Sequence, residues 1–369
     1  MGGRRHDDRV DGAFIPGLRL AGEFYADAVR PLLDQEFPGL RHAAALLGPG
    51  SEVLGFDTER STDHDWGPRL QLFLGADDAE RLAGPITEML AGRLPAAFRG
   101  YPVAFEVTRE PGDSAGHRVG DGAGHRVEVT GLGRWLTGRL GFDPRRGVTG
   151  PDWLATPSQR LAEVTAGAVF HDGPGELSRA RARLTWYPDD VWRYVLSCQW
   201  RRISQEEAFP GRCAEAGDEL GSAVVTARLV RDLMHLWLLM NRRYPPYSKW
   251  LGTAFARVPG AAALGASLAA ALSATGWPAR ERHLSRGYVI AAEAHNRLGL
   301  TGPVDPSTRG FFDRPFQVLD AGRFADALTA TISDPLVKRW PPIGAADQFM
   351  DNTDALGDPR YPRAVITAR

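Results

Sequence analysis

Residues 42–74 read HAAALLGPGSEVLGFDTERSTDHDWGPRLQLFL, and this stretch decides how the N-terminal part of the chain folds. Its two apolar runs, at 42–47 and 69–74, have the length and composition of buried β-strands. A Gly-Pro-Gly-Ser turn at 48–51 ends the first run, and an Asp-His-Asp triplet at 63–65 precedes the second. The pattern predicts two strands joined by a long polar connection.

The turn and the triplet together suit phosphate and metal chemistry. A glycine-rich turn that opens a short helix directs backbone N–H groups outward toward a phosphate, and Ser51 adds a hydroxyl donor. Asp63 and Asp65 are two residues apart, so in an extended chain their carboxylates share one face. Paired carboxylates supply the hard oxygen ligands that Mg²⁺ prefers. The alternative interpretation is a polar surface turn with solvated acids.

Strand and helix patterns alternate on both sides of this stretch. Pro68 fits only an edge or a bulge, so we expect a bulge there and a regular strand from Arg69. The remaining segments expected before residue 141 are helices at 18–36 and 77–98, strands at 103–108 and 125–130, and a helix at 131–140.

From about residue 153 helical patterns replace the strand patterns. The predicted helices lie at 157–167, 176–185, 189–204, 213–243, 246–257, 260–275, 279–298 and 322–333. Residues 170–176 are expected to form a loop that caps a helix. The fold class is therefore expected to be α+β, with a small mixed-sheet domain at 13–145 and an all-helical bundle domain at 152–369. The stretch between them is expected to be a linker.

Composition excludes several classes of protein. The 44 basic and 45 acidic residues give a net charge of −1, which argues against a general electrostatic hold on nucleic acid or an anionic membrane. No run approaches the roughly 20 apolar residues of a membrane helix, and the N-terminus lacks a signal-peptide core. Two cysteines exclude a disulfide framework, and the histidines lack metal-binding spacing. We expect a soluble, cytoplasmic protein.

The segment RRYPPYSKW, residues 242–250, carries one of the two lysines of the chain. Lys249 is expected in the first turn of a helix, where the helix dipole disfavours a cation unless an anion such as a triphosphate is near. Tyr247 could stack on a base or a substrate ring. The alternative is that the aromatic side chains belong to the core and that Lys249 is solvated.

The Gly-Pro-Gly-Ser turn followed after 11 residues by Asp-His-Asp resembles the signature of the polymerase-beta-type nucleotidyltransferase superfamily. The longer motifs GSEVLGFDTERSTDHDWGP, WYPDDVW and RRYPPYSKWLGTAF resemble an uncharacterised bacterial domain-of-unknown-function family, over about residues 15–355. That family couples a nucleotidyltransferase-like N-terminal domain to a helical C-terminal domain. The resemblance implies that Gly50 and Ser51 hold nucleotide phosphates, and that Asp63 and Asp65 hold Mg²⁺ or Mn²⁺. His64 departs from the superfamily, which usually has an apolar residue there.

The superfamily usually supplies a third carboxylate from a neighbouring strand. Glu128 and Glu106 are both acids flanked by apolar residues in predicted strands, and Glu128, on the later strand, is preferred. The other interpretation of Glu128 is a solvent-facing strand residue.

These residues lead to the expectation of a Mg²⁺-dependent nucleotidyltransferase that transfers NMP from an NTP, expected to be ATP, to a hydroxyl of a small molecule. Glu128 would orient or deprotonate the acceptor, and Lys249 would neutralise charge on the leaving pyrophosphate. Nucleic acid and membranes are not expected as partners, and the sequence leaves the oligomeric state open. Two alternatives remain: a catalytically silent nucleotide-binding regulatory protein, or a glycosyltransferase that uses the Asp-x-Asp pair.

Overall fold

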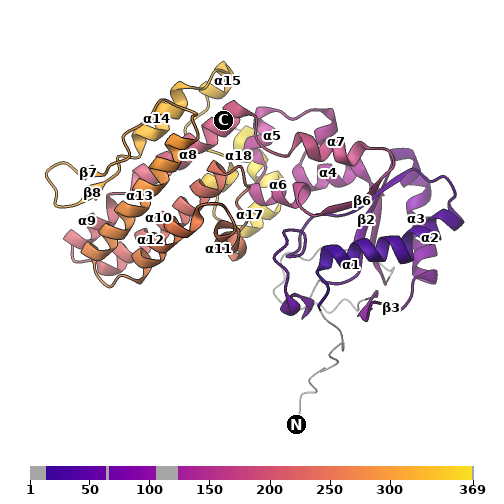
Figure 1. Ribbon diagram of the computed structural model, residues 1–369. Coiled ribbons are helices and arrows are strands. Elements are labelled where there is room, and N and C mark those ends of the chain that lie inside the picture. The colour runs from indigo at the N-terminus through magenta and orange to yellow at the C-terminus, as the bar shows by residue number, and fades with distance from the viewer. Residues whose placement is uncertain (1–13, 64–65, 105–123, 368–369) are drawn as a thin grey trace, which may run out of the picture. The chain divides into compact units, whose positions relative to one another are not determined.

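The computed structural model describes residues 14–63, 66–104 and 124–367 (Figure 1). These residues form an α+β structure with a four-stranded sheet toward the N-terminus and a largely helical region after it. The density of internal contacts divides the chain into two compact units. The first unit contains residues up to 148 together with 160–185, and the second contains 149–159 and 186 onward.

The sheet of the first unit contains four strands in the order β5-β2-β1-β6. Strand β1 (His42–Leu46) pairs antiparallel with both β2 (Arg69–Leu74) and β6 (Ala168–Asp172), and β2 runs parallel to β5 (Arg126–Gly131). The two central strands are buried along almost their whole length, which explains why their sequences are continuous apolar runs.

Helices cover this sheet and supply half of the buried side chains in its main core cluster. A continuous helical segment consists of α1 (Gly17–Phe24), a π-helical stretch (Tyr25–Val29) and α2 (Arg30–Glu36). With α3 (Ala76–Arg93) it packs on the apolar side chains of β2 and β5. The smaller elements of this unit are η2 (Glu59–Asp63), β3 (Ala97–Phe98), β4 (Tyr101–Pro102), α4 (Leu132–Leu140), η3 (Pro144–Arg146) and α7 (Glu176–Arg183).

The second unit is a helical bundle built around α10 (Glu219–Met240), which packs against five other helices. Its neighbours are α8 (Asp189–Glu206), α9 (Phe209–Glu215), α11 (Ser248–Ala256), α12 (Ala261–Ser273) and α13 (Trp277–Arg297). The other elements are α5 (Gly150–Ala155), β7 (Arg309–Gly310), β8 (Gln317–Val318), α14 (Gly322–Ala330), α15 (Pro335–Lys338), α16 (Ala346–Phe349), α17 (Thr353–Gly357) and α18 (Arg360–Thr367). Helix α6 (Ser158–Thr165) carries the point where the chain passes back to the first unit. None of the described helices is long and apolar enough to cross a membrane.

Three local expectations need correction, and a fourth falls mainly outside the described residues. The sequence pattern predicts residues 168–172 within the helical part of the chain, with 170–172 in a loop. They form the edge strand β6 instead. The helix expected at 213–243 is interrupted at Gly217, whose φ is 75°, and Asp218 then caps α10. The main part of the strand expected at 103–108 lies outside the described residues. Strand β2 begins at Arg69 as expected, but Pro68 lies in a bend before it and no bulge occurs in its pairing with β1 or β5.

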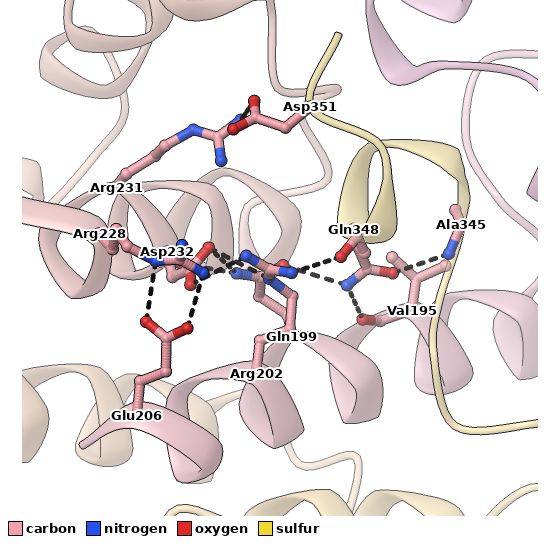
Figure 2. A network of polar contacts seen from close by, with 10 residues as sticks. All are labelled: Val195, Gln199, Arg202, Glu206, Arg228, Arg231, Asp232, Ala345, Gln348 and Asp351. Carbon is pink, nitrogen blue, oxygen red and sulfur yellow. Dashed lines mark hydrogen bonds and ion pairs between the residues drawn. The ribbon is translucent and has the colours of Figure 1, made fainter. Parts of the chain in front are cut away.

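A buried polar network joins α8, α10 and α16 in the second unit (Figure 2). The carboxylate of Asp232, whose residue is 4% exposed, accepts hydrogen bonds from Gln199 Nε2 and Arg202 Nε, both at 3.3 Å. Gln348 Nε2 donates to Gln199 Oε1 at 3.1 Å and to the Val195 carbonyl at 3.0 Å. Because each buried polar group in this chain of contacts has a partner, the network attaches the C-terminal segment to the bundle.

Replacing Asp232 by Asn should lower the free energy of unfolding by about 1–3 kcal/mol, because the Arg202 guanidinium loses the anion that it faces. Urea unfolding measures this change. Asp351→Asn is the matched control, since the Asp351 side chain is 83% exposed and its pair with Arg231 is worth little. Equal effects of the two substitutions would show that the network does not contribute to stability.

Candidate functional site

The turn after β1 is held by hydrogen bonds to the sheet and to α6. Leu47 N–H donates to Gln71 Oε1 at 3.0 Å, and Gly48 N–H donates to the Glu163 carbonyl at 2.9 Å. Phe56 N–H donates to the Ser51 carbonyl at 2.8 Å, which closes the segment as a turn. The short helix expected from Ser51 is therefore absent, and hydrogen-bonded turns occupy 51–55 instead.

An ion pair fills one side of this turn. Arg69, the first residue of β2, donates from Nε to Glu52 Oε1 at 2.7 Å and from Nη2 to the Pro49 carbonyl at 2.7 Å. The Glu52 side chain is only 3% exposed. Gly50 has a φ of 139°, and a Cβ at this position would overlap with Arg69 Nη2. Glycine is favoured at position 50 because an L side chain rarely adopts this φ, whereas the end of the Arg69 side chain could move aside.

Three backbone N–H groups of the turn lack a hydrogen-bond partner within the described part of the chain. The N–H groups of Gly50, Ser51 and Glu52 donate to no residue that the structure describes. Gly50 and Ser51 are partly exposed, so solvent reaches the turn. Consecutive backbone N–H groups near a guanidinium are donors of the kind that bind anions in other proteins.

Glu128 lies on β5 directly opposite Gln71 of β2. Burial raises the pKa of its carboxyl group, and the Arg139 guanidinium and the side chains of Trp135 and Gln71 offset this only in part. Trp135 Nε1 is buried and forms no hydrogen bond to any residue that the structure describes. Glu128 is therefore a partly buried acid in contact with polar groups, and the interpretation of a freely solvated strand residue does not describe its surroundings.

Glu128 and the turn share neighbours. A Cβ at Gly48 would lie 3.6 Å from both Arg139 Nη2 and Trp135 Cζ2, so both side chains lie against the turn. Gln71, which faces Glu128, accepts the hydrogen bond from Leu47. The charged side chains gathered at this end of the sheet are Arg69, Arg139, Arg160, Glu52, Glu128 and Glu163.

Sequence reasoning selected Gly50, Ser51 and Glu128 as candidates but did not select the arginines around them. Arg69 follows the Asp-His-Asp triplet by four residues. A basic residue so close to this triplet could have been selected from the sequence as a phosphate-binding candidate. Arg139 and Arg160 had no such signal, because arginine is abundant throughout the chain and these two come from later helices.

The predicted metal ligands lie at the limit of the described structure. Asp63 is the last residue of η2, and nothing is described of its side chain. Asp65 and the alternative third carboxylate, Glu106, lie outside the described residues. Among the residues that are described, no group of three or more His, Cys, Asp or Glu side chains could hold a metal ion. Glu128 fits a metal as one oxygen donor of a larger set, and that set would need Asp63 and Asp65.

Lys249 and Tyr247 belong to the second unit. Helix α11 starts at Ser248, so Lys249 lies in its first turn as expected. Lys249 Nζ is 5.1 Å from the centroid of the Trp250 ring, which is a cation–π contact. Tyr247 is 43% exposed and its N–H donates to Gln159 Oε1 at 3.1 Å. An exposed tyrosine beside a lysine is compatible with a ligand-binding surface on this unit.

The aromatic motifs of the second unit contact each other. Tyr187 packs against Tyr244 with ring centroids 5.2 Å apart, and Trp186 lies 4.8 Å from Tyr244. Both tyrosines are buried, and desolvation raises their pKa values well above the usual range. The WYPDDVW and RRYPPYSKW motifs therefore form one aromatic core cluster.

Comparison with known proteins identifies one related family. Residues 153–251 match the model of a domain of unknown function, DUF4037, and the match includes both aromatic motifs. No family model that names a nucleotidyltransferase matches the N-terminal part. No curated protein and no solved structure matches the chain. Over residues 153–251 the chain is thus similar to DUF4037, a family whose function is unknown.

Proposed function

We propose that this protein is a metal-dependent nucleotidyltransferase that transfers NMP from an NTP to a small-molecule hydroxyl and releases pyrophosphate. The observation that carries the proposal is the set of N–H groups at Gly50, Ser51 and Glu52 that donate to no described residue, next to the Arg69 guanidinium. Backbone N–H groups and a guanidinium are the donors that bind nucleotide phosphates in other proteins. The turn therefore supplies the phosphate site.

Glu128 supports the proposal as the base. The pKa of Glu128 is raised, so it lies nearer to neutral pH than the pKa of an ordinary glutamate. General acid–base catalysis favours such a pKa. Glu128 would accept the proton of the acceptor hydroxyl while that oxygen bonds to the α-phosphorus and the bond to pyrophosphate breaks. Asp63 and Asp65 would hold Mg²⁺ or Mn²⁺, which neutralises phosphate charge when bound.

A second candidate function is a nucleotide-binding regulatory protein without catalysis. The observation that favours it is the Arg69–Glu52 ion pair, because Glu52 is almost fully buried beside the proposed phosphate site. Arg69 shares its guanidinium with this carboxylate, which leaves it suited to hold a bound phosphate but weakens the added positive charge that transfer would need. The third interpretation, a glycosyltransferase, predicts binding of a UDP-sugar in place of turnover of an NTP.

The experiment that tests the proposal incubates the protein with Mg²⁺, each α-labelled NTP, and a panel of aminoglycosides, nucleosides and sugars. The expected result is pyrophosphate release with transfer of the α-label, both abolished by EDTA. NTP binding without label transfer to any acceptor would support the regulatory function. UDP-sugar binding alone would support the glycosyltransferase, and absence of binding by all of these ligands would refute the proposal.

A further inference from the structure

A hollow of about 330 Å³ lies between η3 and α7 of the first unit, in part of the segment that the sequence analysis treated as a linker. Its charged lining consists of Asp143, Arg145 and Arg146 from the η3 turn and Glu176, Arg179 and Arg183 from α7. None of these six residues belongs to the turn site described above. The volume is at the lower end of the range for small-ligand sites.

Two of the arginines are already oriented by the backbone. Arg183 Nη1 donates to the carbonyls of Pro144 and Arg145, at 2.9 and 2.7 Å. Arg179 Nη2 donates to the Pro174 carbonyl at 3.1 Å. Because one end of each guanidinium is fixed in this way, the remaining N–H groups lose little further conformational entropy when they bind a ligand.

The two acids of the hollow are already neutralised by a third arginine. Arg145 Nη2 lies 2.8 Å from Asp143 Oδ2, and Arg145 Nη1 lies 2.7 Å from Glu176 Oε2. Burial alone would raise the pKa of Asp143, but the hydrogen bonds from Arg145 lower it below its usual value. Asp143 therefore stays charged, and both acids are paired with Arg145.

Counting charges leaves an excess of two positive charges in the hollow, from four arginines and two carboxylates. The Arg146 guanidinium makes no hydrogen bond to any described residue, so it is available to a ligand. Arginines that line one hollow repel one another, and an anion bound in the hollow relieves this repulsion. A charge of about −2 is that of a phosphate monoester above its second pKa of about 6.

We propose that this hollow binds the phosphate group of a small phosphate monoester, held by the N–H groups of Arg146, Arg179 and Arg183. A small ligand is favoured over a nucleic acid because Asp143 and Glu176 border the hollow and would repel the neighbouring phosphates of a polymer. The site acts independently of the proposed nucleotide transfer.

Titration calorimetry of the full chain with inorganic phosphate and with phenyl phosphate tests this site. The double variant Arg146→Gln, Arg179→Gln should weaken both ligands by about tenfold or more, since each substitution removes a charge-assisted donor. Arg134→Gln, on the exposed face of α4, removes the same kind of charge outside the hollow and should leave binding unchanged. Arg183 is left intact because it also holds η3 in place.

Glu176→Gln supplies a result that misfolding cannot imitate. This substitution frees Arg145 Nη1 and raises the charge of the hollow by one, so phosphate should bind several-fold more tightly. No binding of phosphate or phenyl phosphate, or an equal loss in Arg134→Gln, would overturn the proposal. Binding restricted to a single-stranded oligonucleotide or to phosphatidic acid vesicles would also overturn it.

Discussion

NMP transfer should fall by about 10³-fold or more when Asp63 and Asp65 are both replaced by Asn. The sequence assigns the metal to these two carboxylates, and a catalytic metal contributes several kcal/mol of transition-state stabilisation. The amides keep the size of the side chains but bind Mg²⁺ weakly, so NTP affinity in the presence of Mg²⁺ should fall as well. Transfer of α-label and metal-dependent NTP binding measure the two effects.

The matched control for this variant is Asp77→Asn with Asp78→Asn, in the first turn of α3. The control also removes two negative charges from the first unit. These charges lie at the start of a helix, where acids contribute only modest stability. This control should retain NMP transfer. Full activity in the Asp63 and Asp65 variant would remove the proposed metal site and leave the Asp-x-Asp pair as a surface turn.

Glu128→Gln should lower kcat by about 10²–10⁴-fold, the usual contribution of a positioned general base. The structural reason is the location of Glu128 beside Gln71, whose side chain also contacts the turn. Glutamine keeps the shape and can still accept a hydrogen bond, but it cannot take a proton. Glu128→Asp restores the carboxylate in a shorter side chain and should recover part of the rate.

The pH profile separates a base from a merely structural residue. A base must be deprotonated, so kcat of the unmodified protein should rise with pH through the pKa of Glu128, which burial raises. The Gln variant should lack this dependence. An identical profile in both proteins would contradict the assignment of Glu128 as the base.

The free energy of unfolding of the Glu128→Gln variant should stay nearly the same as that of the unmodified protein, or increase. Because the folded-state pKa of Glu128 is raised, its protonated form stabilises the fold. That contribution is complete below the unfolded-state pKa and is lost as pH rises through the folded-state pKa. At neutral pH the charged carboxylate therefore costs stability, and Glu128→Gln removes this cost. Urea unfolding at neutral pH, measured beside kcat, distinguishes lost catalysis from lost folding.

The elements that the sequence predicted well are those with strong local periodicity. Strands β1 and β2 and helix α8 lie within a few residues of the expected positions, whereas α3 ends at Arg93 and α10 begins only at Glu219. Their apolar runs are long enough to identify burial without knowledge of the partner segment. The α+β architecture follows directly from these elements.

Strand β6 shows what local patterns miss. Its five residues, AVFHD, are only partly buried and carry two polar side chains. They form a strand because β1, more than 100 residues earlier in the chain, offers an unpaired edge. An isolated segment of this composition does not reveal such a partner, so the sequence favoured a loop.

Some features of the candidate site follow from the sequence, and others depend on the tertiary structure. Residue type and spacing along the chain singled out Gly50, Ser51 and Glu128, and glycine at position 50 is explained by its φ and the approach of Arg69. The contact of Arg139 with the turn, and the raised pKa of Glu128, depend on the packing of α4 against the sheet. Such effects arise from distances between residues far apart in sequence.

By itself the sequence determined the central strands, the helical bundle and the turn with its glycine and serine, because each depends on local periodicity or backbone sterics. Only the tertiary structure decided which charged groups meet. It brought Arg69 to Glu52, Glu128 to Gln71, and the arginines of η3 and α7 to one hollow. Electrostatic interactions depend on spatial separation and burial, and folding sets both through contacts that the linear order of residues does not encode locally.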